Sequence, residues 1–599
     1  MFSRKTKIVC SMGPAVATDE ITERLILAGM NVARFNFSHG SHEEHKGRMD
    51  RVRRCARKLN RHVALLLDTK GPEIRTGMTA GGGTVAFHAG DEVLVTVDGC
   101  ETEAAADGKP ARLSLNWRAL PDKAAPGVKI LIADGLLELE VESVADGAVR
   151  CRAKNAAEIG SRKNVNLVGI HAGLPILGEQ DKKDLEFGAS QEVDFVAASF
   201  VSFASEVREV RAFLQSVGSR AKVIAKIENE EGVNNIEEIA EAADGVMVAR
   251  GDLGVQMPTE RIPLAQKHII SVCRNAGKFV ITATQMLDSM IVNPRPTRAE
   301  LTDVANAIFD GTDAVMLSGE TANGSYPVEA VEMMAKIAVT VEDSPEFCRK
   351  MHNDALSWTE PEGDIGQFMA RNAYTTASDA RAMAIITPTR SGHTAQMISK
   401  YRPEQSVVAV TPDPVVARQM LLHWGVTPLL SKMAGTSDEM LRNAVKIALD
   451  AGVIHMSDRI VLAAGIPLSN PIMLNTIRVM LVGSVLAKAT RGGCAKSAGP
   501  KTYGEVVFVE KPDELSAFSN RRSNLILVCK DLTEDFIPLL RLVNGVVAEH
   551  DCTIPESVLQ IVNPDLVWLI NAPGAFSALE TGLAVTLDGK NLMIYEGFV

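Results

Sequence analysis

The stretch that decides the fold reads AKVIAKIENEEGVNNIEEIAEAADGVMVARGDLGVQ and covers residues 221–256. Two apolar runs in it, Val223–Ile227 and Val246–Ala249, have the length of β-strands, and the amphipathic segment between them favours a helix capped by Asn234. A strand, a short helix and a second strand within about thirty residues are typical of a βαβ unit, whose strands run parallel. The sequence therefore predicts an α/β fold built around this unit.

Polar side chains stand where both of these strands end. Lys226 and Glu228 are two positions apart, so on a strand they project from the same face, and Asp252 follows the second strand. Because the carboxyl ends of parallel strands lie at one edge, we expect the three side chains to gather there. Two carboxylates beside an ammonium suit a divalent cation, while a structural ion pair is the alternative interpretation.

Short apolar runs of strand length recur through the first 320 residues, with amphipathic helical stretches in most of the gaps, which predicts a (β/α)₈ barrel. We expect this TIM barrel to comprise residues 1–77 and 170–344. The intervening residues 78–169 carry short, partly alternating runs separated by Gly and Asp, as in a small β-barrel domain. This domain would be inserted after the third strand, on the active-site face, where it could act as a lid.

Three further segments follow the barrel. Residues 345–490 resume the alternation of strands and helices and predict a C-terminal α/β domain. The Gly-rich stretch within 491–502 is typical of a linker, and residues 503–599 form an extra β-rich α/β domain.

Composition narrows the function. The chain has 599 residues, 46% hydrophobic residues and a net charge of −11 with scattered Lys and Arg, which argues against nucleic-acid and membrane-surface binding. Nine cysteines without a CxxC pair favour free thiols in a reducing compartment. The first residues lack the apolar core of a signal peptide, and we expect a cytoplasmic protein.

The ends of the other predicted strands add arginines, hydroxyls and carboxylates. Arginine binds phosphate in a bidentate manner, carboxylates hold Mg²⁺, and hydroxyls suit a monovalent cation. Such a set is suited to phosphoryl transfer by positioning and charge neutralisation. Seven motifs occur in this order: ARFNFSHG, DTKGPEIRTG, AKIEN, MVARGDLGV, ITATQMLDSM, NPRPTRAE and DGTDAVMLSGETA.

These motifs resemble those of pyruvate kinase across about residues 1–485. The resemblance implies the fold predicted above, with an effector-binding α/β domain, and a homotetramer. It also implies transfer of the phosphoryl group of phosphoenolpyruvate to ADP, giving pyruvate and ATP, the last step of glycolysis. A catalytically silent sensor and another barrel enzyme of phosphoenolpyruvate chemistry, such as a mutase or lyase, are the alternatives; the intact motif residues disfavour both.

The resemblance also implies residue roles. Lys226 would stabilise the transferring phosphoryl group and the enolate, Arg34 would bind the phosphate, and Thr284 or a nearby water would supply the last proton. The substrate carboxylate would meet Thr284 and the amides of Gly251 and Asp252. The remaining implied sets are Glu228 and Asp252 for Mg²⁺ or Mn²⁺; Asn36, Ser38, Asp68 and Thr69 for K⁺; and Asn36, His39, Arg75 and Lys163 for the nucleotide.

Two positions depart from the family pattern. Gln256 stands where the family usually has Glu, and the lid segment around Lys163 lacks the usual Gly and Pro. At Glu73, some family members carry Lys and work without K⁺, so a chain with Glu73 is expected to need the ion.

The loop after the strand predicted at Ala382–Ile386 suggests regulation. Hydroxyls and free amides at a helix N-terminus can hold an anion, although a plain N-cap turn would look the same. The loop matches the effector-phosphate loop of the family, which implies activation by a phosphorylated metabolite bound by Thr389, Arg390, Ser391, Gly392, His393 and Thr394.

The last hundred residues are similar to the swivelling phosphohistidine domain of enzymes that take phosphate from phosphoenolpyruvate. That family has a reactive His after a Gly-rich turn, and here no His stands at the matching position. His550 comes several residues early, between Glu549 and Asp551, which would repel a phosphoryl donor. We therefore expect a structural or regulatory role for this domain.

Overall fold

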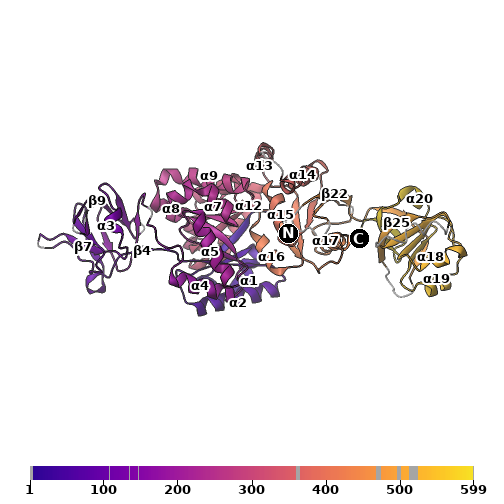
Figure 1. Cartoon of the computed structure of the whole chain (residues 1–599), viewed down its shortest axis with the longest axis horizontal. Helices are drawn as coiled ribbons and strands as arrows, with labels where there is room; N and C mark the ends of the chain where they lie inside the picture. Colours follow the sequence, from indigo (N-terminus) through magenta and orange to yellow (C-terminus); the bar gives the residue numbers. More distant parts are fainter. Residues whose placement is uncertain are drawn as a thin grey trace. The chain divides into compact units, whose positions relative to one another are not determined.

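The computed structural model describes residues 4–106, 108–133, 135–145, 147–170, 172–358, 364–456, 458–466, 474–494, 501–511 and 524–597. The predicted βαβ unit is present (Figure 1), with β14 (Lys222–Ile227) and β15 (Gly245–Ala249) parallel and Lys226 opposite Met247. Its helical part is broken in two, α6 (Glu230–Asn234) and α7 (Ile236–Ala242). The cap expected at Asn234 is wrong, because Asn234 is the last residue of α6 and Asn235 occupies the N-cap position of α7 without a side-chain cap bond. Asn229 caps α6 instead, accepting the Gly232 N–H at 2.7 Å.

The predicted barrel is confirmed as a closed sheet in the order β1-β17-β16-β15-β14-β13-β3-β2. All neighbouring strands are parallel, so their carboxyl ends meet at one mouth. The other strands are β1 (Lys7–Ser11), β2 (Val32–Asn36), β3 (Ala64–Asp68), β13 (Phe195–Ala198), β16 (Phe279–Ala283) and β17 (Ala314–Leu317).

Helices cover the outside of the barrel, as Figure 1 shows for α1, α2, α4, α5, α9 and α12. Their bounds are Asp19–Ala28, His42–Lys58, Glu179–Ser190, Ala204–Ser216, Ile262–Asn275 and Pro327–Glu342, with α10 at Arg298–Asp310 and α13 at Pro345–Ser357. The barrel interior is filled by large apolar side chains such as Phe195 and Phe279, whose rings meet edge to face. At Gly245 a Cβ would lie 2.1 Å from the Phe279 ring, so only glycine fits there.

The inserted domain between β3 and α4 is a sheet in the order β4-β12-β8-β9-β10-β6-β7 with an apolar core of its own. Its strands are β4 (Ile74–Arg75), β6 (Glu92–Thr96), β7 (Ala111–Ser114), β8 (Lys129–Ile132), β9 (Leu137–Ala145), β10 (Ala148–Ala153) and β12 (Asn164–Leu167), beside a separate pair β5 (Val85–Phe87) and β11 (Ala157–Ile159). Sequence reasoning missed four strands of four residues or fewer, namely β4, β7, β11 and β12. In Figure 1 the chain leaves the barrel for this lid at β4.

The chain divides into two compact units, one of residues 3–358 and 418–425 and a second of residues 359–417 and 426–599. The short segment 418–425 thus belongs with the barrel. Leu421 and Leu422 lie in the same apolar cluster as Phe279, and Arg418 pairs with the buried Asp194 at 2.8 Å. The segment therefore contributes to the core of the barrel unit.

The second unit begins with the predicted α/β domain. Its sheet has the order β20-β19-β18-β21-β22, and only the last pair is antiparallel. The strands are β18 (Ala384–Pro388), β19 (Ser406–Thr411), β20 (Val426–Leu430), β21 (Arg459–Ala464) and β22 (Thr476–Leu481), and the helices include α14 (Ile365–Asp379), α15 (His393–Lys400) and α17 (Ser437–Asp450).

An eight-stranded sheet in the order β23-β30-β29-β25-β26-β27-β28-β24 forms the extra domain. Its strands are β23 (Val485–Lys488), β24 (Arg491–Gly493), β25 (Lys501–Phe508), β26 (Leu525–Cys529), β27 (Gly545–Ala548), β28 (Val567–Ile570), β29 (Ala584–Asp588) and β30 (Met593–Glu596), with helices α18 (Ile537–Leu540), α19 (Glu556–Val562) and α20 (Ala575–Ala578).

The boundaries expected for this domain need correction. Arg491–Gly493, predicted as part of a linker, is an edge strand paired with β28, and Val485–Lys488, predicted in the α/β domain, pairs with β30. The glycines in β24 serve close packing, since a Cβ at Gly492 would lie 2.6 Å from Leu569. Residues 495–500 of the expected linker lie outside the described residues.

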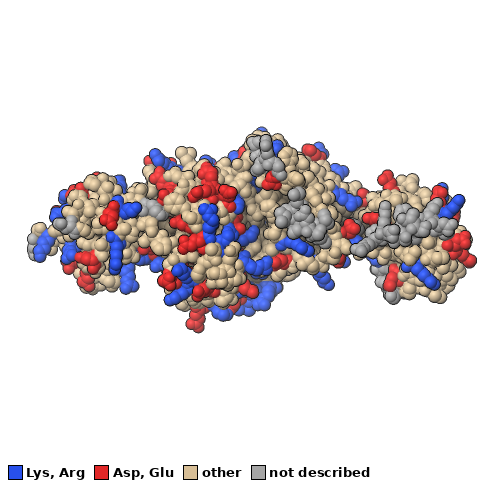
Figure 2. All heavy atoms as spheres, in the orientation of Figure 1, with Lys and Arg blue, Asp and Glu red and all other residues tan. Residues whose placement is uncertain are grey.

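Charge is mixed over the visible surface. Figure 2 shows Lys and Arg among Asp and Glu rather than in a single patch. Within the described ranges, no helix has both the length and the apolar character needed to cross a membrane.

Candidate active site

Lys226 lies at the centre of the barrel mouth, as predicted. Its Nζ is 3.0 Å from Asp68 Oδ1 and 2.9 Å from Glu228 Oε1, and it donates to Ser199 Oγ at 2.7 Å. All of these groups are buried. The register explains the gathering, because Asp68, Ala197 and Ile224 lie side by side on adjacent strands at the same height in the sheet.

The charges in this cluster stabilise one another. Burial would lower the pKa of Lys226, but the Asp68 and Glu228 carboxylates outweigh it, and the pKa is raised above its ordinary value. Burial opposes ionisation of Asp68 as well, yet Lys226 and Arg34 hold the pKa of this carboxyl below its usual range. The site therefore keeps a protonated ammonium beside an ionised carboxylate.

Arg34, in the middle of β2, joins the same cluster through Asp68. Its Nε donates to Asp68 Oδ2 and its Nη1 to Ser11 Oγ, both at 2.7 Å. These bonds fix the side chain, since its exposed fraction is only 12%. The remaining guanidinium donors give the mouth a rigid anion-binding group.

The four residues expected to hold K⁺ lie around the ends of β2 and β3. Asn36 and Asp68 are register partners, and Asn36 Oδ1 accepts the Ser38 N–H at 3.1 Å. The buried Thr69 accepts the Ser199 N–H at 3.2 Å through its hydroxyl. The atoms that these four residues can offer to a cation are oxygens, which suit a hard monovalent cation.

Glu228 and Asp252 are the two carboxylates expected to hold a divalent cation. Glu228 is 2% exposed, and burial raises its pKa to about 8; the Lys226 ammonium acts against this increase and the charge of Asp252 adds to it. Two carboxylates close enough to repel each other are stabilised by a cation between them. Within the described residues, no group of three or more His, Cys, Asp or Glu side chains could hold a metal.

Thr284 and Gly251 meet where β16 and β15 end. Thr284 Oγ1 accepts the Gly251 N–H at 2.8 Å and donates to Ala283 O at 2.7 Å. Gly251 and Asp252 belong to the first turn of α8 (Arg250–Gln256). The predicted substrate-carboxylate group is therefore assembled from two adjacent strand ends.

The expected nucleotide residues lie toward the lid. Arg75 pairs with Glu73 at 2.6 Å and donates to Arg162 O at 2.7 Å, next to Lys163, whose side chain is exposed. His39 is exposed too, with its carbonyl accepting from His45 Nε2 at 2.8 Å. A cleft of about 610 Å³ is lined by Glu73, Asn164 and Asp252, and Asn164 directly follows Lys163 in the chain.

Comparison with known proteins decides the family. Residues 3–331 match the model "Pyruvate kinase, barrel domain", and residues 367–480 match "Pyruvate kinase, alpha/beta domain". Pyruvate kinases of Staphylococcus aureus strains MRSA252 and USA300 are 42% identical over 599 residues, which is 99% of each chain. The chain belongs to the pyruvate kinase family.

A solved pyruvate kinase from Cryptosporidium parvum agrees with this assignment. It has a TM-score of 0.75 and 40% identity, covering 80% of this chain and 96% of its own. As a pyruvate kinase, the chain is a phosphotransferase of glycolysis acting on phosphoenolpyruvate and ADP, and its family generally uses divalent and monovalent cations. The silent-sensor and mutase or lyase alternatives are thereby set aside.

The loop expected to bind the effector phosphate, residues 389–394, connects β18 to α15. Gly392, with φ of 84°, precedes the helix, and its N–H donates to Thr389 Oγ1 at 3.0 Å. Thr389, Arg390 and Thr394 line a cavity of about 60 Å³ together with residues that sequence reasoning missed, namely Ser431, Lys432, Met433, Met440 and Asn443.

Several residues of the pyruvate kinase site were also missed. Ser11 ends β1 and Ser199 follows β13, so the strand-end rule would have found both had it been applied to the first and fourth strands. Glu320, 1% exposed, accepts the N–H groups of Ser318 and Leu287 and so joins two strand-end loops. The position of Glu320 after the eighth strand predicts a carboxylate at the barrel mouth, but no sequence signal indicates that it joins these two loops.

Proposed function

We propose that the groups around Lys226 perform phosphoryl transfer from phosphoenolpyruvate to ADP in the manner implied by their positions. Glu228 and Asp252 would hold Mg²⁺ or Mn²⁺, and Asn36, Ser38, Asp68 and Thr69 would hold K⁺. Bound there, the cations would neutralise charge on the phosphates and polarise the enolate oxygen.

The chain's own residues do the positioning. The Arg34 guanidinium, fixed by Asp68 and Ser11, binds the transferring phosphoryl group. The Lys226 ammonium, kept protonated by its carboxylate neighbours, stabilises the charge that develops on the phosphoryl group and the enolate. On the nucleotide side, Asn36, His39, Arg75 and Lys163 bind the ADP phosphates.

The substrate carboxylate binds the Gly251 and Asp252 amides and the Thr284 hydroxyl. Thr284, or a water beside it, delivers a proton to the methylene carbon of the enolate. Support comes from the 2.8 Å bond between Gly251 N and Thr284 Oγ1, which places amide and hydroxyl together.

The observation that carries this proposal is the buried Lys226 ammonium between Asp68 and Glu228. A coupled assay with phosphoenolpyruvate, ADP, Mg²⁺ and K⁺, following pyruvate, tests it. Wild type should form pyruvate and lose this activity when either cation is omitted. Equal turnover without a divalent cation would contradict the assignment of Glu228 and Asp252.

We propose further that the loop 389–394 binds the phosphate of an activating sugar phosphate or nucleotide. Thr389, Arg390 and Thr394 line the cavity there, and Lys432 adds a second positively charged residue to its lining. Thr389→Glu should abolish activation by phosphorylated sugars and nucleotides because its carboxylate repels the anion. Thr375→Glu on α14 is the control and should keep it. Unchanged activation in Thr389→Glu would place the site elsewhere.

The domain architecture and assembly complete the proposal. The chain acts as a homotetramer, and its extra domain, similar in kind to the swivelling phosphohistidine domains, serves stability or regulation. His550 lies 3.6 Å from Asp531, a neighbour that disfavours an incoming phosphoryl donor. Phosphohistidine at His550 after incubation with phosphoenolpyruvate would overturn this role.

A further inference from the structure

Two consecutive residues at the end of β16 have a left-handed backbone. Thr284 has φ of 63° and Gln285 has φ of 54°. This region is unfavourable for residues other than glycine, and most of all for a β-branched residue such as threonine. Such a backbone conformation persists only when surrounding groups stabilise it.

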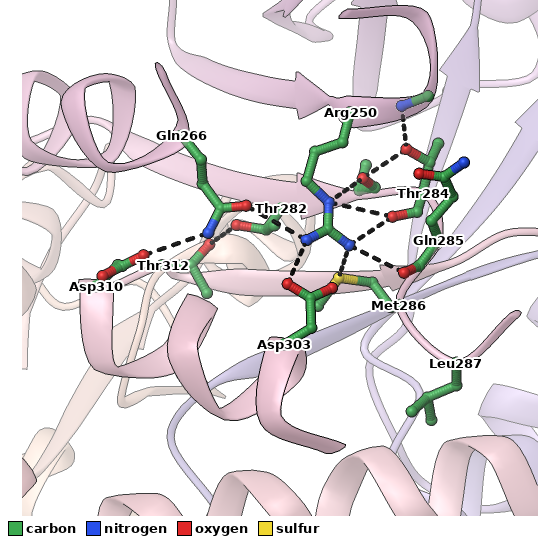
Figure 3. A network of polar contacts seen from close by, with 12 residues as sticks. Arg250, Gln266, Thr282, Thr284, Gln285, Met286, Leu287, Asp303, Asp310 and Thr312 are labelled. Carbon is green, nitrogen blue, oxygen red and sulfur yellow. Dashed lines mark hydrogen bonds and ion pairs between the residues drawn. The ribbon is translucent and has the colours of Figure 1, made fainter. Parts of the chain in front are cut away.

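The side chain that holds the turn is Arg250, the residue before Gly251. Its Nη2 donates to Thr284 O at 2.7 Å and to Gln285 O at 3.1 Å, and its Nε reaches Ala283 O at 3.3 Å (Figure 3). One guanidinium thus binds three successive carbonyls of the turn. Five N–H donors in one plane make arginine suited to this, whereas lysine offers a single ammonium.

The guanidinium is itself fixed. Its Nη1 donates to Asp303 Oδ1 at 2.7 Å, and only 9% of the side chain is exposed. Gln266, 3.4 Å from the same Nη1, is held in turn by Asp310 at 3.2 Å, as Figure 3 shows. The charge is therefore paired and the donors are directed at the turn.

The turn decides where the Thr284 hydroxyl lies. With the backbone left-handed, Oγ1 reaches the Gly251 N–H at 2.8 Å. If the backbone of Thr284 relaxed to negative φ, its Cα–Cβ bond would rotate away from Gly251. Arg250 therefore connects the strand end that carries Gly251 and Asp252 to the one that carries Thr284.

We propose that Arg250 is a positioning residue of the pyruvate kinase reaction, which holds Thr284 in its left-handed conformation and so places the hydroxyl at the reacting carbon. The inference rests on the proposed role of Thr284. It requires no contact between Arg250 and substrate.

The test separates positioning from mere stability. Arg250→Lys should lower kcat by about 10²-fold, as expected for a reacting group displaced by about 1 Å. KM for phosphoenolpyruvate should rise by a smaller factor, because the displaced Thr284 hydroxyl is only one of the groups proposed to bind the substrate carboxylate. The matched control is Arg274→Lys, another buried arginine paired with an aspartate, Asp354 at 3.0 Å, on α9. It should lose stability without a comparable loss of kcat.

Recovery of kcat by a second substitution in the turn would not be expected if Arg250 served stability alone. Gln285→Gly removes the backbone penalty at an exposed position and should keep wild-type kcat. In the double variant Arg250→Lys/Gln285→Gly, kcat should recover by about tenfold, because the turn then needs less support. A double variant no faster than Arg250→Lys overturns the proposal. If Arg250→Lys does not fold, Asp303→Asn, with a smaller loss of kcat and the same rescue, replaces it.

Thr284→Ala distinguishes the proposed role of Thr284 from the positioning role of Arg250. A large loss of kcat in Thr284→Ala with none in Arg250→Lys overturns only the positioning role. Wild-type kcat in Thr284→Ala overturns the proposed role of Thr284 and the positioning inference with it.

Discussion

Gln256 Nε2 donates to Asn166 Oδ1 at 2.7 Å, which joins α8 of the barrel to β12 of the lid. Gln256 is the position that departs from the family's usual Glu, and both residues line the 610 Å³ cleft. A neutral hydrogen bond therefore connects the helix carrying Asp252 to the lid that carries Lys163.

Gln256→Ala should loosen the lid and raise KM for ADP while leaving kcat nearly unchanged. A hydrogen bond of about 1 kcal/mol corresponds to roughly a fivefold change. Steady-state kinetics of Gln256→Ala, Asn166→Ala and the double variant would measure it. Additive effects in the double variant would show that the two side chains do not act together.

Lys226→Met keeps the bulk of the side chain and removes its charge. Since the ammonium acts mainly on charge that develops in the transition state, kcat should fall by roughly 10² to 10³-fold with little change in KM. Lys222→Met, at the start of the same strand β14, is the control and should stay active. An effect confined to KM would refute the assigned role.

Replacing K⁺ by a large organic cation should abolish most turnover. Glu73 brings negative charge to the cleft, where it pairs with Arg75 at 2.6 Å and Lys70 at 3.3 Å and so takes up positive charge that could otherwise meet the phosphates. A small cation is needed to offset the substrates. Comparable initial rates in KCl and tetramethylammonium chloride would disprove this requirement.

Asp194 should make stability depend on pH. Burial raises its pKa to about 6, although Arg418 acts against the shift. Because the folded pKa exceeds the unfolded value of about 3.9, folding favours the protonated form. Its contribution is present below about pH 4 and is lost as pH rises through 6, at up to about 1.4 kcal/mol per pH unit within that window.

Urea denaturation of wild type and Asp194→Asn between pH 4 and 7 would detect this contribution. As pH rises from 4 to 7, the urea midpoint of wild type should fall relative to that of Asp194→Asn. The exposed Asp343→Asn is the control and should follow wild type. Parallel curves for wild type and Asp194→Asn would rule the effect out.

Truncation should be made before β23. A chain ending at Val482, which is buried in the α/β core, keeps β22 and removes the whole extra sheet. It should retain turnover and change thermal stability or effector response. Ending instead at residue 498 would leave Val485–Lys488 without its partner β30 and should promote aggregation. Loss of turnover in the shorter chain would assign the domain a catalytic part.

Much of the fold follows from local pattern. Phe195–Ala198 and Leu525–Cys529 are fully buried strands, and their unbroken apolar runs made them visible. Strands β23 and β24 escaped because their pairing partners, near Tyr595 and Trp568, are distant in sequence. Gly492 and Gly493 suggested a linker where the structure needs small residues under Leu569 and Trp568.

Some contacts of the site could likewise be predicted from the sequence, and others could not. Lys226, Asp68 and Glu228 could be brought together from the strand ends alone, since parallel register fixes their height. The three carbonyl contacts of Arg250 and the bond between Gln256 and Asn166 depend on how side chains cross between elements. No spacing in the sequence encodes those crossings.

The segment 418–425 has a consequence for synthesis on the ribosome. Trp424 packs with Phe347, and the backbone N–H of Trp424 donates to Asp313 Oδ1 at 3.1 Å. The chain between residues 359 and 417, which precedes this segment, belongs to the other unit. The barrel core therefore lacks Leu421, Leu422 and Trp424 until translation has passed well into the α/β domain. At roughly 5 to 20 residues per second, the nascent barrel waits several seconds for its last core residues. During that interval, Phe279 and its neighbours are the apolar surface that a chaperone would meet.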